Sequence, residues 1–133
     1  MGFSGLREFI ELLDREGELA RVRVPVDLDQ ELGAVCVTSL RGHGPALLFE
    51  CPGGKGVPIF INALASRKRY ALAMECNQQE VHHEWNRRVS RPLPPVPVDS
   101  GPCHEVILQG DDINILDLPA PRLNSLDGVA FLT

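Results

Sequence analysis

The run GPALLFE, Gly44 to Glu50, places four apolar residues in succession at positions 46–49. A continuous apolar run of this length is typical of a strand that is buried on both faces, so it predicts an internal strand. A second apolar run, at 57–61, follows the glycine-rich loop CPGGKG at 51–56. Two short strands around such a loop predict a hairpin or two sheet neighbours, and the sequence leaves their pairing open.

The chain before this run alternates between helical and strand periods. Ser4 is placed to cap a first helix that Gly17 ends. The apolar residues of this helix recur at helical spacing: Leu6, Phe9, Ile10 and Leu13. Residues 20–24 then alternate apolar and basic side chains up to Pro25, which predicts a strand with one solvent-facing side.

A second helix is predicted between this strand and Gly42. Asp27 and Asp29 place negative charge at its start, where the helix dipole favours it. Its expected buried stripe is Leu32, Val35, Cys36 and Leu40. The pattern therefore predicts that this helix covers one face of the sheet.

Two further helices are predicted after residue 61. Ser66 is placed to cap the first, and Asn77 with Glu80 resembles a capping box at the start of the second. The apolar positions of these helices are Tyr70, Leu72 and Met74 in the first and Val81, Trp85 and Val89 in the second. Arginines 87, 88 and 91 lie at the helix end where the dipole favours cations, which indicates helix stabilisation rather than a phosphate site.

These periods predict an α/β domain over residues 1–91, with α+β as the alternative, in which helices pack on a small mixed sheet. Residues 92–102, PLPPVPVDSGP, contain five prolines and predict a stiff linker or surface strap. We expect the last quarter, HEVILQGDDINILDLPAPRLNSLDG at 104–128, to organise the rest of the chain. Residues 105–109 alternate and predict an edge strand, whereas Pro119 and Pro121 exclude helix and central strand.

An edge strand leaves backbone donors and acceptors without partners unless another strand covers it. We therefore expect residues from about 92 onward to pack poorly or to find a partner, such as a second copy of the chain. The surface that this segment would cover is expected to lie outside the sequence.

Length, composition and charge exclude several classes of function. A chain of 133 residues with 44% hydrophobic residues can build one ordinary core. The net charge of −5 argues against binding to duplex nucleic acid or to an anionic membrane surface. No apolar run approaches the roughly 20 residues of a bilayer span, and the acidic N-terminal region lacks a secretory signal. A soluble, cytoplasmic protein is expected.

The residues that could carry chemistry do not form a catalytic set. The four cysteines lack a C-x-x-C pair, so reduced thiols are expected. The GGKG run at 53–56 lacks the spacing and the Ser or Thr of a phosphate-binding P-loop, which favours a plain turn. His82 and His83 point about 100° apart on a helix, which favours a solvated face over a metal site. Cys103 and His104 would face opposite sides of a strand.

The acidic residues of the last quarter are a weaker candidate for a cation site. These are Asp111, Asp112, Asp117 and Asp127. Turn chemistry explains the first two without a cation. We assign no catalytic, cofactor-binding or metal-binding residue from these patterns.

Several segments, in this order, resemble the amino-terminal part of UbiD-family decarboxylases over nearly the whole chain. They are the opening L-R-x-F-I at 6–10, GPALLFE at 44–50, NALASRKRYALAM at 62–74, and GDD-x-x-x-x-x-LP at 110–119 with Asp-Gly at 127–128. The resemblance implies a carboxy-lyase that reversibly and non-oxidatively decarboxylates aromatic or α,β-unsaturated acids. It also implies prenylated flavin mononucleotide as the cofactor, with manganese and potassium.

The resemblance further implies an amino-terminal α/β domain, a central cofactor domain that would begin in residues 103–133, and a carboxy-terminal domain used in oligomerisation. The family's metal ligands and catalytic residues would follow Gly128, so none is carried over to this chain. The chain departs from the family pattern with Val129 and Phe131 after Asp-Gly and with Cys51 after LLFE.

Two hypotheses follow from the resemblance. In the first, the chain is an amino-terminal portion or subunit of a UbiD-like decarboxylase, not catalytic alone. Its partners would be the remaining domains or subunits, or a second copy bound through the 103–133 edge. In the second, it is a stand-alone accessory or binding module that keeps the domain without the chemistry. Whether the coding frame or an adjacent gene continues with the central domain would distinguish the two.

Overall fold

The structure, a computed structural model, describes residues 2–128, so the departures at 129 and 131 lie outside it. Within this range the helices are α1 (Leu6–Arg15), α2 (Glu31–Arg41), α3 (Arg67–Met74) and α4 (Val81–Val89). The strands are β1 (Leu19–Val22), β2 (Ala46–Phe49) and β3 (Ile59–Ile61). Three 3₁₀ helices follow: η1 (Pro102–His104), η2 (Gly110–Asp112) and η3 (Ile115–Asp117).

The apolar run ALLF forms the central strand of the sheet. β2 pairs parallel with β1 and antiparallel with β3, in the order β1-β2-β3. All four residues of β2 are buried, and Phe49 is only 1% exposed. The predicted internal strand and the small mixed sheet of an α/β fold are confirmed. β3 begins at Ile59 rather than Val57, because Pro58 has no amide hydrogen to donate to a neighbouring strand.

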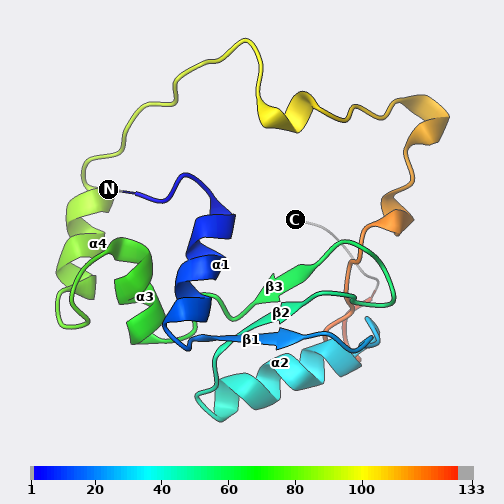
Figure 1. Cartoon of the computed structure of the whole chain (residues 1–133), viewed down its shortest axis with the longest axis horizontal. Helices are drawn as coiled ribbons and strands as arrows, with labels where there is room; N and C mark the ends of the chain where they lie inside the picture. The colour runs from blue at the N-terminus through cyan, green and yellow to red at the C-terminus, as the bar shows by residue number, and fades with distance from the viewer. Residues whose placement is uncertain (1, 129–133) are drawn as a thin grey trace.

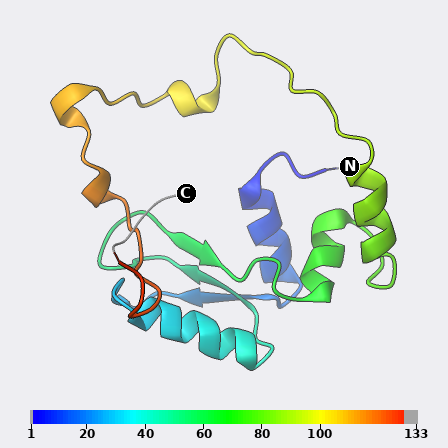
Figure 2. The ribbon, with the colours of Figure 1, turned by 180° about the vertical axis from the view of Figure 1, so that it is seen from behind.

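Helices cover both faces of the sheet (Figures 1 and 2). On one face, Leu32 and Cys36 of α2 pack against Leu47 and Phe49. On the other face, α1 and α3 cover Ala46, and the packed residues are Phe9, Leu13, Leu19, Phe60 and Leu72. Alternation along β2 therefore divides the core into two layers, as side chains on a strand point to opposite faces in turn.

The start of α1 differs from the prediction. Gly5, not Ser4, occupies the N-cap position. Ser4 instead donates its hydroxyl and its amide to the carboxylate of Glu8, the amide across 2.9 Å. The prediction of Ser4 as the cap was wrong because the side chain of Glu8 takes its hydrogen bond. Gly17 follows the helix with φ of 68°, a left-handed conformation suited to glycine, so the predicted stop is confirmed.

The predicted stripe of α2 is only half buried. Leu32 and Cys36 contact the sheet, but Val35 is 37% exposed and Leu40 is 47% exposed. A three-stranded sheet covers a narrow side of the helix, and a helical period does not state how wide the covering surface is. Val35 and Leu40 were therefore predicted wrongly as buried.

The capping predictions for α3 and α4 are confirmed to different extents. The hydroxyl of Ser66 accepts a hydrogen bond from the Arg69 amide at 3.2 Å, as predicted. The carboxylate of Glu80 accepts from the Asn77 amide at 3.4 Å, which is one half of a capping box. Helix α4 itself begins at Val81.

Helix α4 is not buried along its apolar stripe. Trp85 is 51% exposed and Val89 is 61% exposed, and α4 contacts the rest of the domain mainly through α3. The predicted apolar positions of α4 are thus present, but Trp85 and Val89 remain exposed within the described residues.

Glu84 pairs with two arginines near the end of α4. Its carboxylate accepts from Arg87 Nε at 2.7 Å and from Arg88 Nε at 2.6 Å. Arg88 also donates to the carbonyl of Met74 at 2.7 Å, which ties α4 to α3. The interpretation of Arg87 and Arg88 as helix-stabilising residues agrees with these contacts.

These hydrogen bonds from Arg87 and Arg88 lower the pKa of Glu84 from 4.5 to about 2. Because the folded-state pKa is the lower one, the pairs stabilise α4 fully above pH 4.5, and this stabilisation is lost as the pH falls toward 2. A carbon-detected NMR titration of the Glu84 carboxylate is expected to give a midpoint near 2. The Glu84→Gln variant should lack this titration step, and a wild-type midpoint near 4.5 would contradict the prediction.

Residues 92–114 form a long, largely exposed segment, which we name the arch (Figures 1 and 2). It leaves α4 and returns to the opposite end of the sheet. Residues 105–109 are not a strand, so that prediction was wrong: they lie between η1 and η2. A strand requires a partner for its backbone groups, and no described strand of this chain lies beside the arch. The expected weak packing from about residue 92 onward agrees with the arch but was wrong for residues 116–123. These residues pack against the α/β domain of this same chain, because Arg122 pairs with Asp29 through backbone and side chain.

None of the helices in residues 2–128 combines the length and the apolar character that crossing a bilayer requires.

Candidate functional site

The carboxyl ends of the parallel strands β1 and β2 lie at the same edge of the sheet. In open α/β sheets this edge commonly binds ligands, because the loops that follow the strands meet there. Here the loops at 23–30 and 51–58 meet, and the chain returning from the arch lies against them (Figure 1). We name the contact between residues 116–123 and this edge the tail dock.

Two backbone hydrogen bonds form the centre of the tail dock. The amide of Arg122 donates to the carbonyl of Leu28 at 2.9 Å, and the amide of Gln30 donates to the carbonyl of Arg122 at 2.8 Å. Asp29 and Arg122 thus form an isolated parallel β-bridge. One residue of the tail, Arg122, is thus paired through its backbone with the loop that leads into α2.

The side chains of the bridging residues also pair. Arg122 donates from Nε to Asp29 Oδ1 at 2.7 Å and from Nη2 to Asp29 Oδ2 at 2.8 Å, a two-pronged arrangement that fixes the guanidinium plane. The hydrogen bonds from Arg122 lower the pKa of Asp29 below its ordinary value, and the same contact raises the pKa of Arg122. The pair is therefore ionised at neutral pH.

Hydrogen bonds to acidic side chains also fix the loop that carries Asp29. The amide of Asp29 donates to Asp27 Oδ1 at 2.9 Å, and the amide of Asp27 donates to Glu31 Oε2 at 2.7 Å. Asp27 and Asp29 were predicted to favour the start of α2, and they lie in the turn immediately before it. Their second role, in fixing the tail dock, was not predicted.

Lys55 holds the tail from the other loop. Its ammonium group donates to the carbonyl of Leu116 and, at 3.4 Å, to that of Leu118. Gly53 and Gly54 have φ of 58° and 72°, so the GGKG run is the turn that was predicted and not a phosphate loop. Its lysine binds backbone carbonyls of this chain.

Close backbone contact completes the tail dock. A Cβ atom on Gly33 would lie 2.2 Å from the carbonyl oxygen of Leu123, so only glycine permits this approach. Beyond Leu123 the chain turns, and Asp127 Oδ2 accepts from the amides of Leu123 and Asn124, each at 3.0 Å. The tail therefore reaches residue 128 through a defined turn.

The other candidates from the sequence lie apart from this edge. His82 and His83 are exposed on α4, and Cys103 and His104 are exposed in η1. All four cysteines are free thiols, as predicted. Asp111 and Asp112 are exposed in η2, whereas the carboxylate of Asp117 accepts from Asn114 at 2.9 Å. Within residues 2–128 no three His, Cys, Asp or Glu side chains form a group that could hold a metal ion.

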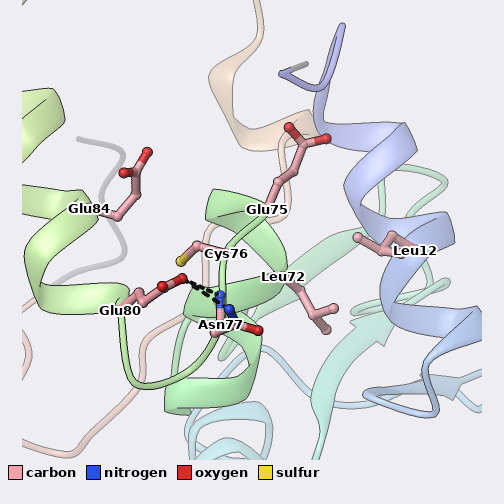
Figure 3. Close-up of a pocket in the computed structure, with 8 residues that line it drawn as sticks. Leu12, Leu72, Glu75, Cys76, Asn77, Glu80 and Glu84 are labelled. Carbon is pink, nitrogen blue, oxygen red and sulfur yellow. Dashed lines mark hydrogen bonds between the residues drawn. The ribbon is translucent and has the colours of Figure 1, made fainter.

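A hollow of about 660 Å³ lies between α1, α3 and α4 (Figure 3). Its lining includes Leu12, Leu72, Glu75, Cys76, Asn77, Glu80 and Glu84. The carboxylates of Glu75, Glu80 and Glu84 spread apart in Figure 3, and Glu80 is hydrogen-bonded to Asn77 while Glu84 is paired with arginines. The hollow therefore does not direct a set of ligands at one point.

Comparison with known proteins identifies the family. Residues 10–89 match the model of the UbiD amino-terminal domain, described as the 3-octaprenyl-4-hydroxybenzoate carboxy-lyase N-terminal domain. This range includes all four helices except the first residues of α1, and all three strands of the sheet.

Solved structures agree with this match. The vanillic acid decarboxylase of Sedimentibacter hydroxybenzoicus is 30% identical with a TM-score of 0.84, over 96% of this chain and 29% of that one. An evolved dimeric form of the UbiD-class enzyme HmfF from Pelotomaculum thermopropionicum, in complex with prFMN, is 29% identical with a TM-score of 0.81, over 92% and 29%. The 3,4-dihydroxybenzoic acid decarboxylase of Enterobacter cloacae is 28% identical with a TM-score of 0.79, over 92% and 28%.

The chain thus spans less than a third of the length of these solved relatives. The match of the family model over residues 10–89, in an α/β domain whose sheet and helices superpose on those of UbiD-class enzymes, shows that this chain belongs to the UbiD family and carries its amino-terminal domain.

Proposed function

We propose that the chain is the amino-terminal portion or subunit of a decarboxylase that acts reversibly and non-oxidatively on aromatic or α,β-unsaturated carboxylic acids, in the cytoplasm. The observation that carries the proposal is the family match over residues 10–89. Two of the solved relatives are decarboxylases of aromatic acids, and a third was solved with prFMN. The cofactor implied for the complete enzyme is prenylated flavin mononucleotide, with manganese and potassium.

Within residues 2–128 the side chains do not form a site that fits that cofactor. A flavin phosphate held by a divalent metal needs several oxygen or nitrogen ligands directed at one point. The described residues contain no such group, and the carboxylates around the hollow in Figure 3 diverge. We therefore assign no catalytic, cofactor-binding or metal-binding residue to this chain, and we propose that the remaining domains or subunits supply them.

The arch supports a binding role for the segment after residue 91. Its exposed large apolar side chains include Leu93 at 91%, Val96 at 83%, Val106 at 76% and Ile107 at 64%. Exposed apolar residues gathered on one segment are typical of an interaction surface. We propose that residues 1–91 form the domain, that 92–102 link it, and that 103–133 begin the central cofactor domain.

The isolated chain is expected neither to retain prenylated flavin nor to decarboxylate. A carbanion left by departing carbon dioxide needs the electron sink that such a cofactor supplies when bound. The purified 133-residue chain is incubated with prenylated flavin, manganese and potassium and then desalted. Flavin absorbance and carbon dioxide release from a panel of aromatic and unsaturated acids are measured. Stoichiometric flavin retention would reveal a site within this chain and contradict the prediction.

The proposed function itself is tested in the source organism. An affinity tag placed before Met1 at the chromosomal locus allows the chain to be purified with whatever polypeptide continues it or binds it. We expect a UbiD-type central domain, in the same polypeptide or as a subunit, with bound flavin and decarboxylase activity on the same panel. Purification of the chain without a central domain and without activity would contradict the proposal and favour the accessory-module hypothesis.

A further inference from the structure

The tail dock accepts residues 116–123 in one register only. The bridge needs an amide hydrogen at the tail position that faces Leu28 and a cation that reaches Asp29, and Arg122 supplies both. A slip by one residue in one direction would place Pro121 there, which has no amide hydrogen to donate. A slip in the other direction would place Leu123 there, which leaves Asp29 without its partner.

Gly33 permits the close approach of the tail backbone from the side of the domain. The carbonyl of Leu123 lies where the Cβ of any other residue would be, at 2.2 Å from its oxygen and 2.9 Å from its carbon. The tail dock thus selects the tail residue by backbone pairing and by charge, and it requires glycine at position 33.

The arch cannot set this geometry. Residues 92–114 are exposed apart from the half-buried Gly101. The hydrogen bonds of residues 101–113 join neighbours within this segment, as between the His104 amide and the Gly101 carbonyl at 2.9 Å. Within the described residues, the tail dock and not the exposed range 92–114 fixes the position of residues 116–128 relative to the α/β domain.

We infer that Asp29, Gly33 and Arg122 are positioning residues that fix the first segment of the proposed central cofactor domain against the α/β domain. The inference rests on the proposed function. It assigns to these residues no contact with the flavin or the substrate: their effect on chemistry passes through the placement of the following domain. Loss of the tail dock is expected to leave the α/β domain folded and to reduce flavin loading and turnover.

The first measurement uses the 133-residue chain. In the Asp29→Asn, Arg122→Met and Gly33→Ala variants, the amides of Gln30 and Arg122 are expected to exchange with deuterium about tenfold faster or more than in the wild type. The amides of Leu47 and Phe49 in the central strand should not change. Gly42→Ala and Arg41→Met, at the far end of α2, are the matched controls, since neither residue contacts the tail. Unchanged exchange at Gln30 and Arg122 would overturn the inference.

The second measurement uses the protein purified through the tag before Met1. Each dock variant is expected to lower flavin content and to reduce kcat by about tenfold or more with little change in KM, because a misplacement of about 1 Å can cost about a hundredfold in rate. The charge-swapped D29R/R122D double variant should regain a large part of the loss, which a general folding defect would not permit.

The outcomes separate the two claims. Wild-type protein that purifies without flavin and without activity overturns the proposed function, and the inference with it. If the wild-type protein is active and the dock variants keep full flavin content and kcat, the inference alone is overturned. The tail dock would then stabilise the tail without affecting the cofactor site. A charge swap that restores nothing after both single changes have reduced flavin content also overturns the inference.

Discussion

Replacing Leu32 with alanine is expected to lower the free energy of unfolding by about 2–5 kcal/mol, whereas Leu40→Ala in the same helix should cost less than about 1 kcal/mol. Leu32 is fully buried in the layer between α2 and the sheet, and Leu40 is 47% exposed near the end of α2. The two changes remove the same atoms from one helix, so their difference measures burial.

Urea denaturation followed by circular dichroism is the measurement. A small domain has a total stability of only about 5–15 kcal/mol, so the Leu32 variant is expected to show a large fall in the midpoint or a loss of the folded baseline. Equal effects of the two substitutions would mean that α2 does not pack on the sheet through Leu32. That result would contradict the two-layer core.

Replacing Arg69 with methionine is expected to destabilise the domain by about 2–4 kcal/mol, because breaking a buried ion pair leaves its partner without compensation. Arg69 is 3% exposed. Its Nη1 atom donates to Glu18 Oε2 at 2.9 Å and to the Gly44 carbonyl at 3.1 Å. It therefore joins α3 to the residue before β1 and to the turn before β2.

The electrostatics of Glu18 agree with this role. Partial burial acts to raise the pKa of Glu18, but hydrogen bonds from Lys68 and Arg69 outweigh it and hold the pKa below its ordinary value. Lys68 would remain in the Arg69→Met variant, at 2.9 Å from the carboxylate. Its side chain is 42% exposed, so it compensates only in part.

Arg67→Met is the matched control for this prediction. Arg67 is an exposed arginine on the same helix, and its replacement is expected to change stability by no more than about 0.5 kcal/mol. The free energies of unfolding of both variants are measured by thermal and urea denaturation and compared with that of the wild type. The Nε atom of Arg69 is buried without a hydrogen-bond partner among the described residues, which costs free energy. Equal stability of Arg69→Met and Arg67→Met would mean that this cost cancels the stabilisation from the Arg69–Glu18 ion pair, and it would contradict the prediction.

Local patterns were sufficient for the framework of the domain. The continuous apolar run of β2 predicted an internal strand, and Ser66 predicted the start of α3 through a hydrogen bond to Arg69 three residues on. Gly17 likewise predicted the end of α1. Each of these features depends on atoms within a few residues, so the sequence determines it without reference to the rest of the fold.

The extent of burial depended on what the fold places opposite each helix. Val35, Leu40 and Trp85 have the spacing of buried residues, yet all three are exposed because the small sheet and α3 cover only part of each helix. The strand predicted at 105–109 is absent for a related reason, since strand pairing requires a second segment and the described fold provides none there.

The tail dock is the feature that only the tertiary structure decided. Asp29 was predicted as a helix-start residue and Lys55 as part of a turn, and no local signal singled out Arg122. Asp29 and Arg122 are 93 positions apart, and Lys55 reaches a carbonyl 61 positions away. The sequence by itself determined the family, the helices and the central strand. Which distant charges and carbonyls meet depends on the folded backbone, because only parallel pairing of β1 with β2 brings the loops of Asp29 and Lys55 to one edge.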